Sequence, residues 1–159
     1  MLFSPALRRA VLLAHVTTSV GLIGAVAAFL ALAVIGATTD SPALANAAYI
    51  AMSAVTWPVI LPLAAAALLI GIVQSLGTAW RLFLHYWVIL KLILTTLSLL
   101  VLALQLTTIN ALAVAAQAGD LTGLENGRHA MILHSAGGLI VLILITLLSI
   151  YKPRGAVSA

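Results

Sequence analysis

The chain contains no cysteine and carries very little charge. Of its 159 residues, 64% are hydrophobic and only 6% are charged, and just three are acidic. Without cysteine there can be no disulfide, no c-type haem attachment and no thiolate metal site. A soluble domain has roughly a quarter charged residues, so this composition is typical of a membrane protein. The net charge of +4 comes from a few bases beside apolar runs and does not indicate nucleic-acid binding.

Four apolar stretches are long enough to cross a bilayer, whose hydrocarbon core of about 30 Å takes roughly 20 helical residues. Runs such as PLAAAALLIG do not alternate polar and apolar residues as barrel strands do. We therefore expect an all-α fold, with residues 1–159 forming one integral membrane domain. Its architecture would be an antiparallel bundle of four transmembrane helices, at about Leu7–Ile35, Ala47–Gln74, Leu82–Leu106 and Ala130–Ile150.

The placement of charge predicts the orientation of this bundle. Acidic residues fall only in the first and third connections, and all loop or terminal bases except Arg128 fall on the other side. Cytoplasmic segments are enriched in Lys and Arg, so both termini and the second connection are expected to be cytoplasmic. The bases on that side are Arg8, Arg9, Arg81, Lys152 and Arg154, and the acids are Asp40, Asp120 and Glu125.

Several local signals refine the helices. Ser4 followed by a proline is typical of a helix start. Pro58 and Pro62 each remove a backbone donor, so the second helix should be kinked. Small residues let membrane helices approach closely. They are therefore predicted to mark helix contacts, at Thr17, Gly21, Gly24 and Ala28 in the first helix and at Ser135, Gly137 and Gly138 in the fourth.

Two histidines are predicted near the cytoplasmic side. His15 lies about 10 Å of helix beyond Arg8, and His85 lies about 6 Å beyond Arg81. Ionisable residues within a membrane usually face the bundle interior. With no carboxylate in the four stretches, Lys91 should extend its ammonium to the interface, lose its proton or hold an anion.

The other two histidines, His129 and His134, both lie in the fourth stretch. Five residues of helix correspond to a rotation of about 140°, so these side chains cannot share a ligand from one face. His129 is expected at the interface, whereas His134 lies deeper and could line an outer cavity. No HExxH sequence, Gly-rich phosphate loop or intramembrane acid pair occurs, so the sequence does not favour an enzyme.

Four motifs carry a family resemblance: AHVTTSVG (14–21), QSLGTAW (74–80), HYWVILKL (85–92) and LSIYKPRG (148–155). They resemble those of a family of small, functionally uncharacterised bacterial four-helix integral membrane proteins. The resemblance implies a multi-pass protein of the bacterial cytoplasmic membrane with a site on the cytoplasmic side. It does not extend to RHAMILHSAGG (128–138), and so implies no role for His129 or His134. The motif residues it marks are His15, Gln74, Ser75, Gly77, His85, Trp87, Lys91, Tyr151, Lys152 and Arg154.

Two classes of function follow. In the first, His15 and His85 bind a b-type haem between the first and third helices. Its propionates would meet Arg8, Arg81 or Lys152, and Lys91 could hold an anionic group. The same histidines, with solvent or Tyr86, could instead hold a copper or zinc ion, although two histidines are too few for a closed zinc site. In the second class, the bundle is a scaffold, a subunit of a larger complex or homo-oligomer, or part of a small-solute transporter. Its histidines then only hydrogen-bond neighbouring helices, and its partners are lipid and other membrane proteins.

Overall fold

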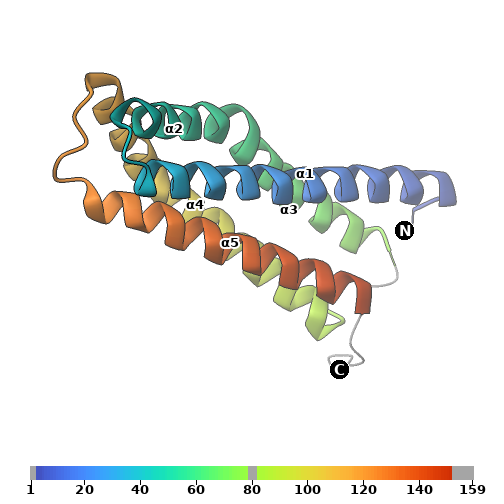
Figure 1. Ribbon diagram of the computed structural model, residues 1–159. Helices are drawn as coiled ribbons and strands as arrows, with labels where there is room; N and C mark the ends of the chain where they lie inside the picture. The colour runs from blue at the N-terminus through green and yellow to red at the C-terminus, as the bar shows by residue number, and fades with distance from the viewer. Residues whose placement is uncertain (1–2, 79–81, 152–159) are drawn as a thin grey trace.

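The computed structural model describes residues 3–78 and 82–151, and that part of the chain is helical apart from its connections (Figure 1). Helices α2, η1 and α3 run on as one rod, Pro42–Leu76. Within the described residues, four rods are long and apolar enough to cross a membrane by length and composition. The protein is thus multi-pass by helix composition, as the sequence predicts. The elements are α1 (Pro5–Thr38), α2 (Pro42–Val55), the π-helix η1 (Thr56–Ile60), α3 (Leu61–Leu76), α4 (Tyr86–Ala118) and α5 (Glu125–Tyr151).

Two helices begin at a serine followed by proline. The Ser4 hydroxyl accepts a hydrogen bond of 3.3 Å from the Leu7 amide at the start of α1, so the predicted cap is confirmed. Ser41 caps α2 in the same way, and the second rod begins at Pro42 rather than near Ala47. The cap serves a first-turn N–H group that has no intrahelical partner, and proline at the first position loses no helical hydrogen bond.

Helix α4 begins and ends later than the expected Leu82–Leu106. His85 precedes it with extended backbone (φ −129°, ψ 131°) and is the N-cap residue, so it does not lie within the helix. At the other end α4 runs on to Ala118, where Gly119 with φ 76° terminates it. The additional turns of α4 include Asn110, whose side-chain oxygen accepts a 3.1 Å hydrogen bond from the indole of Trp57.

The second rod is bent at its prolines. Residues Thr56–Ile60, which include Pro58, form the π-helical turn η1, and α3 leaves the line of α2 there (Figure 1). Thr56 is fully buried, and its hydroxyl donates to the Met52 carbonyl at 2.7 Å. Proline removes a backbone donor, and a widened π turn is one of the known ways in which a helix bends. The predicted kink is therefore present.

The rods form a four-helix bundle. Helix α1 packs against α2, α3 and α5, and α4 packs against the same three helices. Among the described residues α1 and α4 make no close backbone approach, so they lie at opposite corners. Helix α1 begins, and α5 ends, at the same end of the bundle (Figure 1). Many large apolar side chains remain exposed on the outside, which suits contact with lipid.

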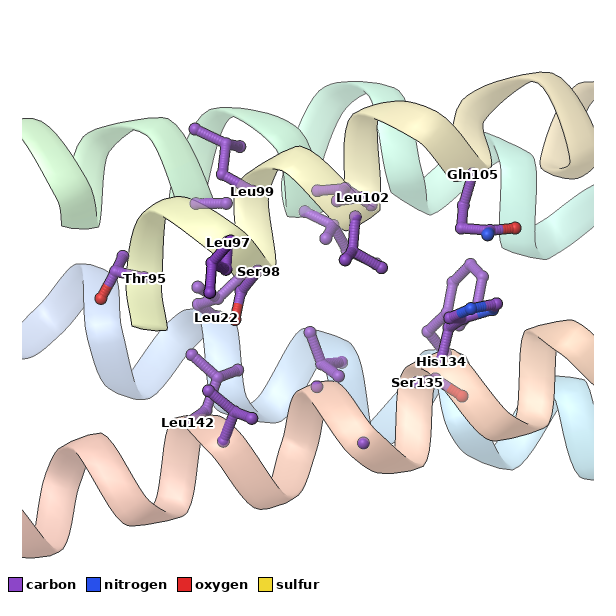
Figure 2. Close-up of a pocket in the computed structure, with 18 of the residues that line it drawn as sticks. Leu22, Thr95, Leu97, Ser98, Leu99, Leu102, Gln105, His134, Ser135 and Leu142 are labelled. Carbon is purple, nitrogen blue, oxygen red and sulfur yellow. The ribbon is translucent and has the colours of Figure 1, made fainter. Parts of the chain in front are cut away.

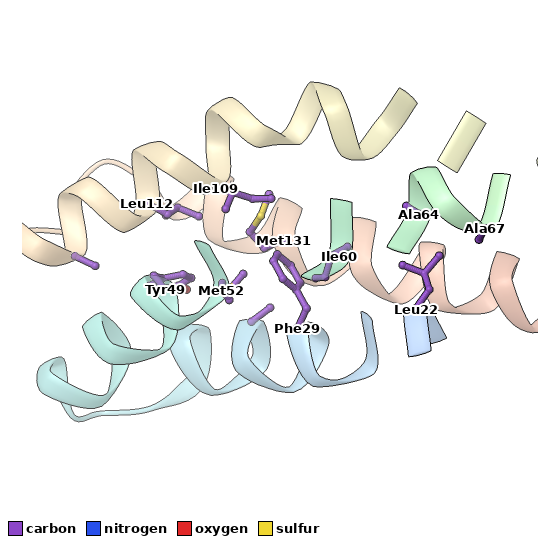
Figure 3. Close-up of a cluster of buried hydrophobic side chains, with 12 residues drawn as sticks. Leu22, Phe29, Tyr49, Met52, Ile60, Ala64, Ala67, Ile109, Leu112 and Met131 are labelled. Carbon is purple, nitrogen blue, oxygen red and sulfur yellow. The ribbon is translucent and has the colours of Figure 1, made fainter. Parts of the chain in front are cut away.

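The tightest packing is at the end of the bundle where α1 passes into α2 (Figure 3). Tyr49, Met52, Leu112 and Met131 are each less than 2% exposed there. A Cβ atom on Gly36 would lie 2.8 Å from Cζ of Tyr49, so only glycine allows α1 and α2 to approach this closely. This end of the bundle is a close-packed core.

Candidate functional site

A cavity of about 500 Å³ lies beside this core, among α1, α3, α4 and α5. It exists because α4 and α5 lose their close packing in the rest of the bundle. Residues 89–108 of α4 and 136–151 of α5, all within the described part, include no buried residue. A Cβ atom on Gly137 or Gly138 would meet no atom within 4 Å, so these glycines border open space and do not mark a helix contact.

The lining of the cavity is mainly apolar and carries no charged side chain. Figure 2 shows Leu22 of α1, Leu102 of α4 and Leu142 of α5 along it. Gln105 of α4 and His134 of α5 lie at one end of the same cavity. An apolar pocket of roughly 300–1,000 Å³ with a few polar groups is the usual form of a small-molecule site.

Three hydroxyl groups in the lining are already satisfied by their own helices. Thr95 donates to the Lys91 carbonyl at 2.8 Å, and Ser98 donates to the Leu94 carbonyl at 2.8 Å. The Ser135 hydroxyl donates to the carbonyl of Met131, one turn earlier, at 2.6 Å. These groups need nothing from a ligand.

Gln105 and His134 differ from those hydroxyl groups. In the part of the chain that the structure describes, the Gln105 amide makes no hydrogen bond. The Nδ1 atom of His134 lies 2.8 Å from the Ala130 carbonyl, which can only accept, so Nδ1 carries the hydrogen. Nε2 of the neutral ring is then a hydrogen-bond acceptor. The polar end of the cavity therefore offers an amide and an imidazole nitrogen that are available to a ligand.

The cavity reaches the outer surface of the bundle. Four of its lining residues are also exposed, namely Leu97 (51%), Val101 (39%), Leu133 (71%) and Gly137. They come from α4 and α5, so the opening lies between these two helices. In a membrane-spanning bundle this surface faces lipid, and a ligand would enter sideways from the bilayer.

The structure places the predicted site residue His15 against α3. A Cβ atom on Gly71 would lie 3.1 Å from Cε1 of the His15 ring, so glycine makes room for the imidazole. The buried Nδ1 atom of His15 has no hydrogen-bond partner among the described residues, and neither has the buried Oε1 atom of Gln74. Gln74 lies one helical turn beyond Gly71, so two polar atoms without partners occur in the same region.

The predicted residues around His85 form an aromatic and cationic group at the start of α4. The His85 and Trp87 rings have centroids 6.1 Å apart. Nζ of Lys91 lies 5.6 Å from the centroid of the Trp87 ring, which is a cation–π distance. This contact was not predicted from the sequence. Tyr86 is 60% exposed. Arg81 lies outside the described residues.

A site shared by His15 and His85 stays a prediction. His15 lies on α1, whereas His85 directly precedes α4, which lies at the opposite corner of the bundle from α1. The described residues contain no group of three or more His, Asp or Glu side chains placed to hold a metal ion. Neither histidine, nor Lys91, belongs to the lining of the cavity.

The residues at the polar end of the cavity were only partly anticipated. His134 was expected to be able to line an outer cavity, but Gln105 was not singled out. The sequence did mark Gln105 as unusual, since it is a lone amide in the apolar run LALQL. Comparisons of the chain with protein-family models, curated proteins and solved structures find no match. The motif resemblance to a bacterial membrane family likewise stays a prediction.

Proposed function

We propose that this protein binds a lipid-soluble small molecule with a polar end in the cavity between α4 and α5. The volume of about 500 Å³, the apolar lining and the opening toward lipid support this proposal. The polar end would lie against Gln105 and His134, and the apolar body along Leu22, Leu102 and Leu142. Because the site holds no charged residue or acid pair, the function is binding or carriage rather than catalysis.

One observation carries the proposal, which is that Gln105 and His134 have unused hydrogen-bonding capacity inside an apolar cavity. A polar group removed from water without a partner costs about 1–3 kcal/mol. A bound molecule that hydrogen-bonds both groups would recover this free energy. Ordered water could do the same, so the experiment must detect the bound molecule itself.

The test is a cavity-filling substitution, Gly138→Leu. Its side chain would enter open space. The matched control is Gly24→Leu, since Gly24 also borders open space but does not line the cavity. Both changes replace a helical glycine, so they alter helix propensity equally. We expect small molecules extracted from purified Gly138→Leu and identified by mass spectrometry to lack a species that wild type and Gly24→Leu retain. Identical extracts from all three proteins would contradict the proposal.

A second candidate function is haem or metal binding at the cytoplasmic side. It is favoured by the buried Nδ1 atom of His15, which has no partner among the described residues. In this proposal His15 and His85 are the ligands, while Arg81 and Lys91 neutralise anionic groups and Tyr86 adds a donor. The absorption spectrum and metal content of the same purified samples test it. A Soret band that His15→Ala removes would support haem. A protein with no such band, no metal and no extracted ligand would favour the scaffold or complex-subunit alternative.

The membrane and the orientation belong to the same proposal. We place both chain ends in the cytoplasm of a bacterial cell and the loops with Asp40 and Asp120 outside, on the support of the charge pattern. The start of α1 and the end of α5 lie at one end of the bundle, which agrees with this arrangement. The cavity then lies within the membrane, with the close-packed core toward the outer face.

A further inference from the structure

The hydrogen-bonding pattern at the polar end of the cavity favours a neutral ligand group that both donates and accepts a hydrogen bond. This inference rests on the proposed binding function and deepens it. We infer that the cavity selects a neutral lipid alcohol, whose hydroxyl group donates to Nε2 of His134 and accepts from the amide of Gln105.

The first step is the tautomer of His134. Its Nδ1 atom is 2.8 Å from the Ala130 carbonyl, so Nδ1 carries the hydrogen and Nε2 carries the lone pair. Nε2 therefore needs a donor from the ligand. A ketone, an ester or an ether has no donor and would leave Nε2 unsatisfied inside an apolar site.

The second step is Gln105, whose amide offers two donors and one acceptor. It makes no hydrogen bond to His134 or to any other residue in the described ranges. A hydroxyl oxygen can accept from this amide while its hydrogen points at Nε2 of His134. One hydroxyl group thus serves both side chains, which a carbonyl oxygen cannot do.

The third step concerns charge and the body of the ligand. No Lys, Arg, Asp or Glu lines the cavity, so a phosphate or carboxylate headgroup would be buried there without a counter-charge. The hydroxyls of Thr95, Ser98 and Ser135 are bonded to their own helices, so the rest of the lining requires only hydrocarbon. The fitting ligand is a hydrocarbon chain or ring system with one neutral hydroxyl end.

The experiment compares farnesol with farnesyl methyl ether, two probes that share a chain and differ in the donor hydrogen. Purified protein in phosphatidylcholine nanodiscs is titrated with each probe, and dissociation constants are taken from the shift in unfolding temperature. We expect the alcohol to bind about three- to tenfold more tightly, the effect of one neutral hydrogen bond. In His134→Phe this preference should disappear.

The matched control is His129→Phe. His129 lies on the same helix and makes the same type of bond, from Nδ1 to the Glu125 carbonyl at 2.8 Å, but it is exposed. It should leave the preference unchanged. Gln105→Leu is the second variant, for use if His134→Phe does not fold, and should weaken farnesol binding by a similar factor.

Equal affinities of the alcohol and the ether in wild type would overturn this inference and leave the binding function standing. An equal loss of preference in His129→Phe would overturn it too, because the effect would not come from the cavity. If neither probe binds, and extracts of Gly138→Leu match those of wild type, the proposed function fails together with it.

Discussion

At the scale of single residues, the contacts of Arg128 explain why this base lies on the side of the bundle where the acidic residues lie. It is the one loop or terminal base on the acidic side of the predicted topology. Its Nε donates to the Tyr49 hydroxyl at 3.0 Å, and its Nη2 donates to the Gly36 carbonyl at 2.9 Å. The guanidinium also lies 5.8 Å from the centroid of the Tyr49 ring. Arg128 thus joins the end of α1 and the middle of α2 to α5.

We predict that Arg128→Met lowers the free energy of unfolding by about 3 kcal/mol, since each of its two hydrogen bonds from a charged group is worth at least about 1.5 kcal/mol. Arg128→Lys should lie between Met and wild type, because an ammonium lacks the planar fork that reaches two acceptors. The exposed Arg8 provides the control, and Arg8→Met should be nearly neutral. Unfolding in detergent measures all three, and a fully stable Arg128→Lys would show that the fork geometry is unimportant.

The candidate site was predictable in part at this scale. Residue type and depth marked His15, His85, Lys91 and His134 as unusual in a membrane helix. They could not show that His134 and Gln105 line the same cavity, because that depends on how α4 and α5 are placed relative to each other. Nor could they show that His85 precedes α4, since its helical depth rested on a start at Leu82 and the helix begins at Tyr86.

At the scale of elements, the residues that start a helix are adjacent in the sequence and can therefore be recognised from it. Ser4 with its proline predicted one start, whereas the same pair at Ser41 was not used and that start was placed too late, near Ala47. Helix contacts were harder to predict from small residues. Gly21 packs against Leu63 of α3, yet Gly24 borders open space. Composition shows where a close approach is allowed, and only the rotation of each helix decides whether it occurs.

Two glycines of α1 should therefore respond in opposite ways to the same substitution. Gly24→Ala should raise the free energy of unfolding by up to about 1 kcal/mol through helix propensity. Gly36→Ala should lower it by about 1–3 kcal/mol, because the new methyl group would lie 2.8 Å from Cζ of Tyr49. Unfolding of both variants under identical detergent conditions checks this. A stabilising Gly36→Ala would mean that α1 and α2 can separate without loss.

At the scale of the whole molecule, one end of the bundle is closely packed, whereas the rest of it contains the cavity. The close-packed end contains Tyr49, Met52 and the Arg128 contacts, and the π turn at Thr56–Ile60 directs α3 away from it. Ile60, the last residue of this bend, and Ala64, one turn further on, line the cavity. The bend, the stretches of α4 and α5 that include no buried residue, and the glycines of α5 together border the cavity, which no single stretch of sequence encodes.

The orientation of this asymmetric bundle is the last prediction. If both chain ends are cytoplasmic, the tight end lies at the outer face and a ligand meets the polar end of the cavity from within the bilayer. The chain has no cysteine, so single cysteines give no background labelling. Asp40→Cys and Asp120→Cys should react with an impermeant maleimide in intact cells, whereas Ala159→Cys should react only after permeabilisation. The opposite pattern would invert the bundle, and the bases at the chain ends would then lie outside, against the positive-inside rule.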